Sequence, residues 1–336
     1  MHWIRVLLAS LVLCCSSTAA VAGELEAVRI GLTRDASTAA VLIAIDAGYF
    51  KMAGLDPKLV VLANDAAVSA AVVSGKADIG MAALSAAFFR DAAAHGLKII
   101  ASRSSDRTGF PMYALLVSQK AHAAGLSGVR GLMNARIGVA GADSSEYYGL
   151  LSIPSRFNLD PGSLRTVVLK STDAELKALA HDDIDAALVP YPTAAQSATK
   201  GRSVFRLSDF AQWQEGVVFS AAKSIASRRS LIEGFMRAYQ HGAADYAINF
   251  LNYDDGGDFI PGPQYDRYLQ LIARQVNIAP ESLAATKTYN DRRANLDAAD
   301  VRKQVQFWKE HGKLGDGISA DEILDLSFIG EEGVAH

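Results

Sequence analysis

A short pattern of residues, LDP at 55–57, VVL at 60–62 and KADI at 76–79, returns later in the chain as LDP at 159–161, VVL at 167–169 and DIDA at 183–186. In both copies the aspartate follows the end of VVL by 16 residues, from Leu62 to Asp78 and from Leu169 to Asp185. Each copy is typical of a strand, a helix and a second strand, so the pair predicts two lobes with similar wiring. Supersecondary units are few in kind, so two unrelated βαβ units remain an alternative explanation.

Strand-like and helix-like segments alternate around both copies, which predicts an α/β fold with mainly parallel sheets. The predicted strands cover residues 28–32, 58–62, 78–82, 98–101, 136–140, 166–169 and 184–189, and the predicted helices cover 38–48, 66–75, 145–157 and 172–181. From about residue 228 onward the pattern is helical. At roughly 150 residues per domain, the 336 residues suggest about two domains.

Two apolar extended stretches, residues 112–118 and 217–220, flank the second copy as two hinge crossings would. We therefore predict that lobe 1 comprises residues 23–118 and 217–336, and that lobe 2 comprises residues 119–216. A ligand that touches both lobes would shift the population towards a closed form.

The first 22 residues are typical of a signal peptide. Arg5 supplies the positive charge, residues 6–15 are apolar, and Ala20-Val21-Ala22 is an A-x-A cleavage signal. We expect cleavage after Ala22 and export to the periplasm. Cys14 and Cys15 both lie in the removed segment, so the mature chain would have no thiol for a disulfide, a metal site or a nucleophile.

The composition indicates a folded protein, since 50% of the residues are apolar and disordered chains are poorer in such residues. The chain has 33 basic and 36 acidic residues, for a net charge of −3. This balance does not suit a surface that must neutralise many phosphates. We therefore expect no nucleic-acid partner.

Signals for catalysis and metal binding are weak. Residues 197–200 and 220–223 match S-x-x-K, but no S-D-N or K-T-G companion accompanies them. The histidines lack H-x-x-x-H spacing, and a calcium loop starting at Asn252 would need a glutamate where Pro263 stands. We therefore expect no catalytic residue, no metal and no cofactor.

Two lobes imply a cleft, and in open parallel sheets ligands bind beyond the carboxyl ends of the strands. Four segments follow such strand ends: residues 33–38, 83–85, 141–145 and 190–193. The repeat pairs the first segment with the third and the second with the fourth. The candidate contacts in the first two segments are Thr33, Arg34, Ser37, Leu84 and Ser85.

Charged and hydroxyl groups near these strand ends favour an anionic ligand. Ser144 and Ser145 open a predicted helix, whose free N–H groups and hydroxyls suit an anion, although plain N-capping by Asp143 or Ser144 would satisfy the same donors. Arg34 and Arg103 follow strands of lobe 1 and could pair with a carboxylate or sulfonate. Such arginines more often are solvated or pair with a nearby acid of the protein.

Aromatic side chains near the predicted cleft leave room for an organic ligand. The candidates are Tyr113, Tyr147 and Tyr191. Tyr191 could stack on a planar group or donate a hydrogen bond, and a half-buried wall residue is the equal alternative.

Three short motifs carry a resemblance to a known family. They are AGYFKMAGL at 47–55, SGKADIG at 74–80, and GVRGL at 128–132 followed by RIGV at 136–139. In this order, behind an export signal, they resemble the nitrate/sulfonate/taurine-type solute-binding proteins of bacterial ABC importers, over about residues 28–191. The resemblance implies a two-lobed periplasmic binding protein (type II) fold, with two parallel or mixed sheets flanked by helices.

The resemblance also implies a function. Such a protein captures a small-molecule anion, here a sulfonate, a nitrate or an aromatic carboxylate, and delivers it to an ABC permease in the inner membrane. We expect the protein to be a monomer and not an enzyme. Because a fold alone does not determine function, a secreted or periplasmic enzyme on the same bilobed fold, such as a pyrimidine-precursor synthase-like protein, stays open as the alternative.

The chain departs from the family at one turn. Many relatives carry a Trp-Glu-Pro-like turn after the last strand of the second lobe, whereas this chain has Pro190-Tyr191-Pro192. The aromatic residue is kept and the acid is lost. This departure argues against a cationic or amino-pyrimidine ligand, which would need a carboxylate partner. The pyrimidine-precursor branch is also disfavoured, because the mature chain has no cysteine for a Cys-rich active-site motif.

Overall fold

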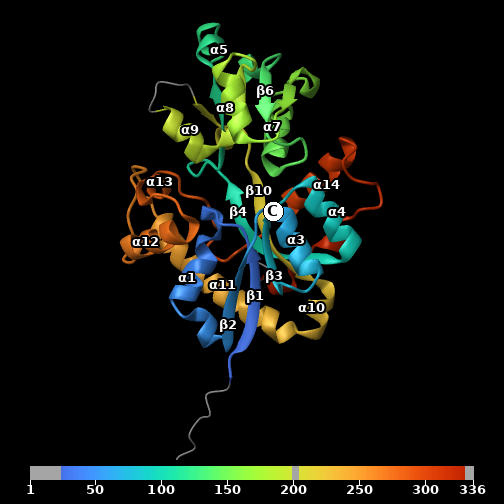
Figure 1. Cartoon of the computed structure of the whole chain (residues 1–336), viewed down its shortest axis with the longest axis vertical. Helices are drawn as coiled ribbons and strands as arrows, with labels where there is room; N and C mark the ends of the chain where they lie inside the picture. The colour runs from blue at the N-terminus through green and yellow to red at the C-terminus, as the bar shows by residue number, and fades with distance from the viewer. Residues whose placement is uncertain (1–23, 199–203, 330–336) are drawn as a thin grey trace, which may run out of the picture.

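Two mixed five-stranded sheets, each flanked by helices, organise the chain into two lobes (Figure 1). The computed structural model describes residues 24–198 and 204–329. The predicted signal peptide and its cleavage site lie outside these residues. Within them, no helix has the length and apolar character needed to cross a membrane. The predicted α/β class, with two sheets flanked by helices, is confirmed.

The first lobe, in the lower part of Figure 1, is built on a sheet with the strand order β2-β1-β3-β10-β4. Its strands are β1 (Glu26–Leu32), β2 (Leu55–Val61), β3 (Ile79–Ala83), β4 (Leu97–Asp106) and β10 (Trp213–Ala221). Strand β1 pairs in parallel with β2 and β3, and β10 runs antiparallel between β3 and β4.

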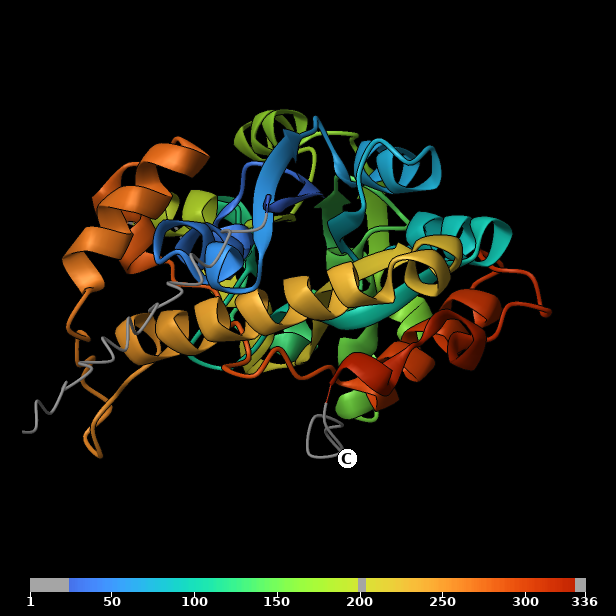
Figure 2. The same ribbon diagram turned by 90° about the horizontal axis from the view of Figure 1, so that it is seen from below.

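Helices cover both faces of this sheet, and the longest of them, α11, crosses the face seen from below (Figure 2). The helices of the first lobe are α1 (Ala39–Asp46), α2 (Tyr49–Met52), α3 (Asp65–Val73), α4 (Ala86–His95), α10 (Ala222–Ser227), α11 (Arg229–Phe250), α12 (Tyr265–Val276), α13 (Pro280–Ala285), α14 (Ala298–Glu310) and α15 (Ala320–Ile323), with the 3-10 turns η1 (Ala36–Thr38) and η4 (Leu326–Phe328). The prediction of a helical region after residue 228 is confirmed.

The second lobe has the strand order β7-β6-β8-β5-β9. Its strands are β5 (Tyr113–Val117), β6 (Arg136–Val139), β7 (Arg165–Val168), β8 (Ala186–Pro190) and β9 (Val204–Arg206). Its helices are α5 (Gln119–Ala123), α6 (Val129–Leu132), α7 (Ser145–Arg156), α8 (Thr172–Ala180) and α9 (Tyr191–Ala198), with the 3-10 turns η2 (Pro161–Ser163) and η3 (Leu207–Asp209).

The repeat in the sequence is also a repeat in the structure. The parallel triplets β2-β1-β3 and β7-β6-β8 occupy the same place in the two sheets. In the first lobe, the backbone N and the Nε of Arg29 donate to Asp78 Oδ2 at 2.8 and 3.0 Å. In the second, the same atoms of Arg136 donate to Asp185 Oδ2 at 2.8 and 3.2 Å. Equivalent ion pairs at the equivalent aspartates support two lobes of similar wiring over a chance match.

The predicted lobe boundaries are wrong for two strands, β5 and β10. Strand β5 pairs with β8 and β9 in the second sheet, although the boundary at residue 118 places it in lobe 1. All of β10 lies in the first sheet, although the boundary at residue 217 divides it. The prediction rested on the apolar stretches of these two strands, and an apolar stretch does not indicate which sheet the strand joins. We infer that the chain crosses between the lobes at residues 107–112 and 210–212.

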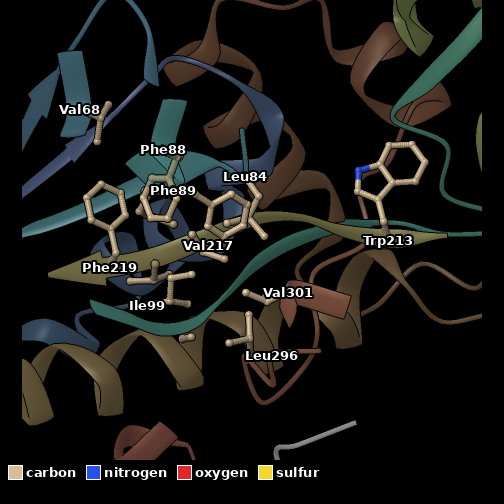
Figure 3. Packing of buried hydrophobic residues seen from close by; sticks show 14 of the residues in the cluster. Val68, Leu84, Phe88, Phe89, Ile99, Trp213, Val217, Phe219, Leu296 and Val301 are labelled. Atoms are coloured by element: carbon tan, nitrogen blue, oxygen red, sulfur yellow. The ribbon is translucent and has the colours of Figure 1, made fainter. Parts of the chain in front are cut away.

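The main hydrophobic core packs the helices against the first sheet (Figure 3). Phe88 and Phe219 are buried at its centre, with ring centroids 5.0 Å apart and nearly perpendicular planes. Trp213, at the start of β10, belongs to the same cluster but stands away from Phe88 and Phe219 in Figure 3. It packs on α7 of the second lobe, where a Cβ at Gly149 would lie 2.4 Å from its ring. The indole therefore fixes α7 against the crossing strand.

Candidate ligand-binding site

A cavity of about 570 Å³ lies between the two lobes. It is lined by Thr33, Arg34, Asp35, Ala36, Ser37, Asn64, Asp65, Ala83, Ser85, Arg103, Pro111, Met112, Tyr113, Ser144, Ser145, Glu146, Pro190, Pro192, Glu215, Ile278, Thr286 and Thr288. This volume is in the range of cavities that hold small organic molecules.

All four strand-end segments singled out in the sequence contribute to this lining. The end of β1 leads into residues 33–37, and the end of β3 leads into Ser85, which caps α4 by accepting from Phe88 N at 3.0 Å. In the second lobe, β6 leads into the start of α7 and β8 leads into Pro192. Parallel strands direct their carboxyl ends to the same edge, which is why segments so far apart in sequence meet here.

Eight of the eleven predicted contact residues line the cavity: Thr33, Arg34, Ser37, Ser85, Arg103, Tyr113, Ser144 and Ser145. Leu84, Tyr147 and Tyr191 do not. Leu84 is fully buried in the core, the Tyr147 ring stacks on Trp308, and Tyr191 packs on the core of the second lobe.

Arg103 is a buried cation at the floor of the cavity, with only 3% of its surface exposed. Its Nη2 donates to Glu215 Oε2 at 3.1 Å, and its Nη1 lies 3.8 Å from Asp35 Oδ2. Burial by itself would lower the pKa of Arg103, but the carboxylates of Glu215, Asp35 and Asp65 outweigh it and raise that pKa. The guanidinium is therefore charged at any physiological pH and is paired within the protein.

Glu215, on β10, is one of the cavity residues that the sequence reasoning missed. It is 1% exposed and accepts hydrogen bonds from Ser104 Oγ at 2.7 Å and from the Tyr113 hydroxyl at 3.2 Å, besides Arg103. Burial, followed by the Glu215 charge, raises the pKa of Tyr113 well above its ordinary value. The signal that could have revealed Glu215 is a carboxylate directly before the apolar run 216–219, where burial demands a partner.

Three further carboxylates of the lining were missed as well. Asp35 caps η1 and accepts from Ser37 N at 2.9 Å. Asp65 is the first residue of α3 and accepts from Ala83 N at 3.1 Å. Glu146 is the second residue of α7. Burial raises the pKa of both Asp65 and Glu146, and neighbouring carboxylates add to this effect.

The start of α7 differs from the open anion site that the sequence suggests. The Ser145 hydroxyl is buried. It accepts a hydrogen bond from Trp213 Nε1 at 2.9 Å and donates one to the backbone oxygen of Glu215 at 3.4 Å. The Ser144 hydroxyl donates to the Gly141 oxygen at 3.4 Å, and neither it nor the Asp143 side chain caps the helix. The Glu146 carboxylate stands in the first turn, so a negative side chain already occupies this helix end.

Arg34 is the second cation of the lining. Its side chain is exposed at the cavity, and it forms no hydrogen bond or ion pair with any residue that the structure describes. Across residues 24–198 and 204–329, no group of three or more His, Cys, Asp or Glu side chains is arranged to hold a metal ion.

Several solved structures share this architecture. The periplasmic aliphatic sulphonate-binding protein SsuA of Escherichia coli is 16% identical, with a TM-score of 0.68 over 89% of this chain and 97% of that one. The alkanesulfonate-binding protein SsuA of Xanthomonas axonopodis pv. citri, solved with MOPS, is 16% identical, with a TM-score of 0.62 over 90% and 99%. The nitrate-binding protein NrtA of Synechocystis PCC 6803 is 11% identical, with a TM-score of 0.58 over 91% and 87%.

At these identities the likeness establishes the fold. No curated protein sequence matches the chain. A family described as NMT1/THI5 like matches residues 35–249, which is more than half of the chain and includes most of the cavity lining. The chain therefore belongs to the NMT1/THI5-like family.

Proposed function

We propose that this protein is the extracytoplasmic solute-binding component of an ABC importer, exported to the periplasm and delivering its ligand to a permease in the inner membrane. The observation that carries the proposal is the cavity of about 570 Å³ between two lobes, lined from both sides by the strand-end segments of the repeat. Sulfonate- and nitrate-binding proteins of the same architecture support it.

The cavity favours an organic solute over a small inorganic ion such as nitrate. Its volume is about that of sites for drug-sized molecules, and Met112, Tyr113 and Ile278 add apolar surface to the lining. An anionic group of this solute, such as a sulfonate or carboxylate, would pair with the free guanidinium of Arg34. The eight lining residues predicted from the sequence are the proposed contacts.

Native mass spectrometry of the protein as purified, followed by identification of any released small molecule, tests the proposal. We expect a bound organic solute that is released unchanged, and a smaller radius of gyration in X-ray scattering when the protein is saturated with it. Chemical conversion of the solute would favour the alternative, an enzyme on the same bilobed fold. Superimposable scattering curves at saturation would contradict lobe closure.

A further inference from the structure

Two carboxylates line the cavity from opposite lobes without a direct ion pair to any described residue. Asp65 stands at the start of α3 in the first lobe, and Glu146 stands in the first turn of α7 in the second. Neither forms an ion pair with any residue in the described part of the chain. Asp65 receives one hydrogen bond, from Ala83 N to its Oδ2.

The buried cation of the cavity, Arg103, is already paired within the protein. Arg103 is ion-paired with Glu215, lies near Asp35 and also attracts the Asp65 carboxylate, so one buried cation serves three carboxylates. Asp65 and Glu146 interact unfavourably with each other and with Glu215. The cavity thus has four carboxylates against the guanidinium groups of Arg34 and Arg103. Like charges in a partly desolvated space repel strongly, and a bound cation would relieve this repulsion.

Arg103 provides a second, independent indication of a ligand. Its side chain is almost fully buried and lines the cavity, yet its Nη1 has no hydrogen-bond acceptor among the described residues. The distance of 3.8 Å to Asp35 is too long for a direct hydrogen bond. A buried guanidinium nitrogen without an acceptor is costly, and a ligand oxygen near Nη1 would satisfy it.

We propose that the ligand carries a positively charged nitrogen, held between Asp65 and Glu146, and an oxygen acceptor that faces Arg103. This inference rests on the proposed function and names the class of solute. A cation between Asp65 and Glu146 touches both lobes at once, so its binding energy favours the closed form. The sequence argued against a cationic ligand because the Pro190-Tyr191-Pro192 turn lacks an acid. The structure provides carboxylates elsewhere in the cavity, at the starts of α3 and α7.

Matched pairs of solutes test the charged nitrogen directly. The probes are 4-aminobutyrate with butyrate, 6-aminohexanoate with hexanoate, 3-aminopropanesulfonate with propanesulfonate, and 4-(aminomethyl)benzoate with 4-methylbenzoate, each titrated by calorimetry into the mature protein. Loss of a charge-assisted hydrogen bond costs roughly ten- to a hundredfold in affinity. We expect every binder to be an amine, with its amine-free partner at least about tenfold weaker.

Variants assign the nitrogen to its partners. Glu146→Gln should weaken binding of the amine by about tenfold or more and reduce its advantage over the amine-free partner, whereas Glu233→Gln, at an exposed site on α11, should change neither. Equal or tighter binding of the amine-free member, or full affinity in Glu146→Gln, would overturn this inference and leave the proposed function standing. If no member of any pair binds and the purified protein carries no small molecule, both proposals fail.

Discussion

The buried carboxylate of Glu175 makes the stability of this protein depend on pH. Glu175 lies on α8 with none of its surface exposed, and neither of its carboxylate oxygens has a hydrogen-bond partner in the residues that the structure describes. Burial, followed by the negative charge of Glu146, raises its pKa from 4.5 to about 8. An ionised carboxylate at this position therefore opposes folding.

The size of the effect follows from the difference between the two pKa values. Between pH 4.5 and about pH 8 the folded protein keeps a proton that the unfolded chain releases, so the free energy of unfolding falls as the pH rises. The stabilisation from the protonated side chain is complete below pH 4.5 and is lost as the pH rises through 8. At about 1.4 kcal/mol per pH unit, the loss between about pH 5 and about pH 8 is about 3–4 kcal/mol.

Glu175→Gln removes this titration while keeping the shape of the side chain. Urea unfolding of the parent and the variant at about pH 5, 6.5 and 8 should show an advantage of the variant that grows with pH by about 3–4 kcal/mol. Glu233→Gln removes a half-exposed carboxylate that pairs only with Arg229 one helical turn away on α11, and its stability should follow that of the parent closely at every pH. A difference between Glu175→Gln and the parent that is the same at all three pH values would refute the reasoning.

Two further substitutions probe the contact between α7 and β10, and a third prediction concerns the lobes. Gly149→Ala would place a Cβ 2.4 Å from the Trp213 ring and should destabilise the protein by about 1–3 kcal/mol in thermal unfolding, whereas Gly128→Ala, whose Cβ would meet open space, should be tolerated. Ser145→Ala leaves the Trp213 indole N–H without its acceptor and should cost about 1–3 kcal/mol, more than Ser144→Ala; equal melting temperatures for these two variants would contradict the structural role of Ser145. The lobes should close when the ligand binds, and scattering curves that stay unchanged at saturating ligand would rule this out.

Much of the fold was predictable because its signals are local. The alternation of apolar residues indicates strands and helices in sequence order, and the spacing of the two aspartates, Asp78 and Asp185, reveals the repeat. Loops at the carboxyl ends of parallel strands converge on one edge whatever their composition. For this reason the four strand-end segments were found from the sequence, and all four line the cavity.

The sequence predicted less well which individual side chains point into the cavity. Within residues 83–85 the sequence cannot tell which side chain turns to the cavity, and the structure buries Leu84 in the core while Ser85 lines the cavity. Tyr147 is also adjacent to a lining residue, but its ring stacks on Trp308, some 160 residues further along the chain. The direction of a side chain at a strand or helix end depends on the packing of distant elements.

The sequence by itself determined the α/β class, the duplication and the position of the cavity, because periodicity, spacing and strand direction act over short stretches of chain. Only the tertiary structure decided the sheets that β5 and β10 join and the charge of the site. Asp65, Glu146 and Glu215 come from three separate elements, and each is an unremarkable acid in its own segment. Folding brings them to the lining of one cavity and reduces their contact with water. Burial and mutual repulsion, which have no counterpart in the sequence, then influence the charge of the ligand that the cavity favours.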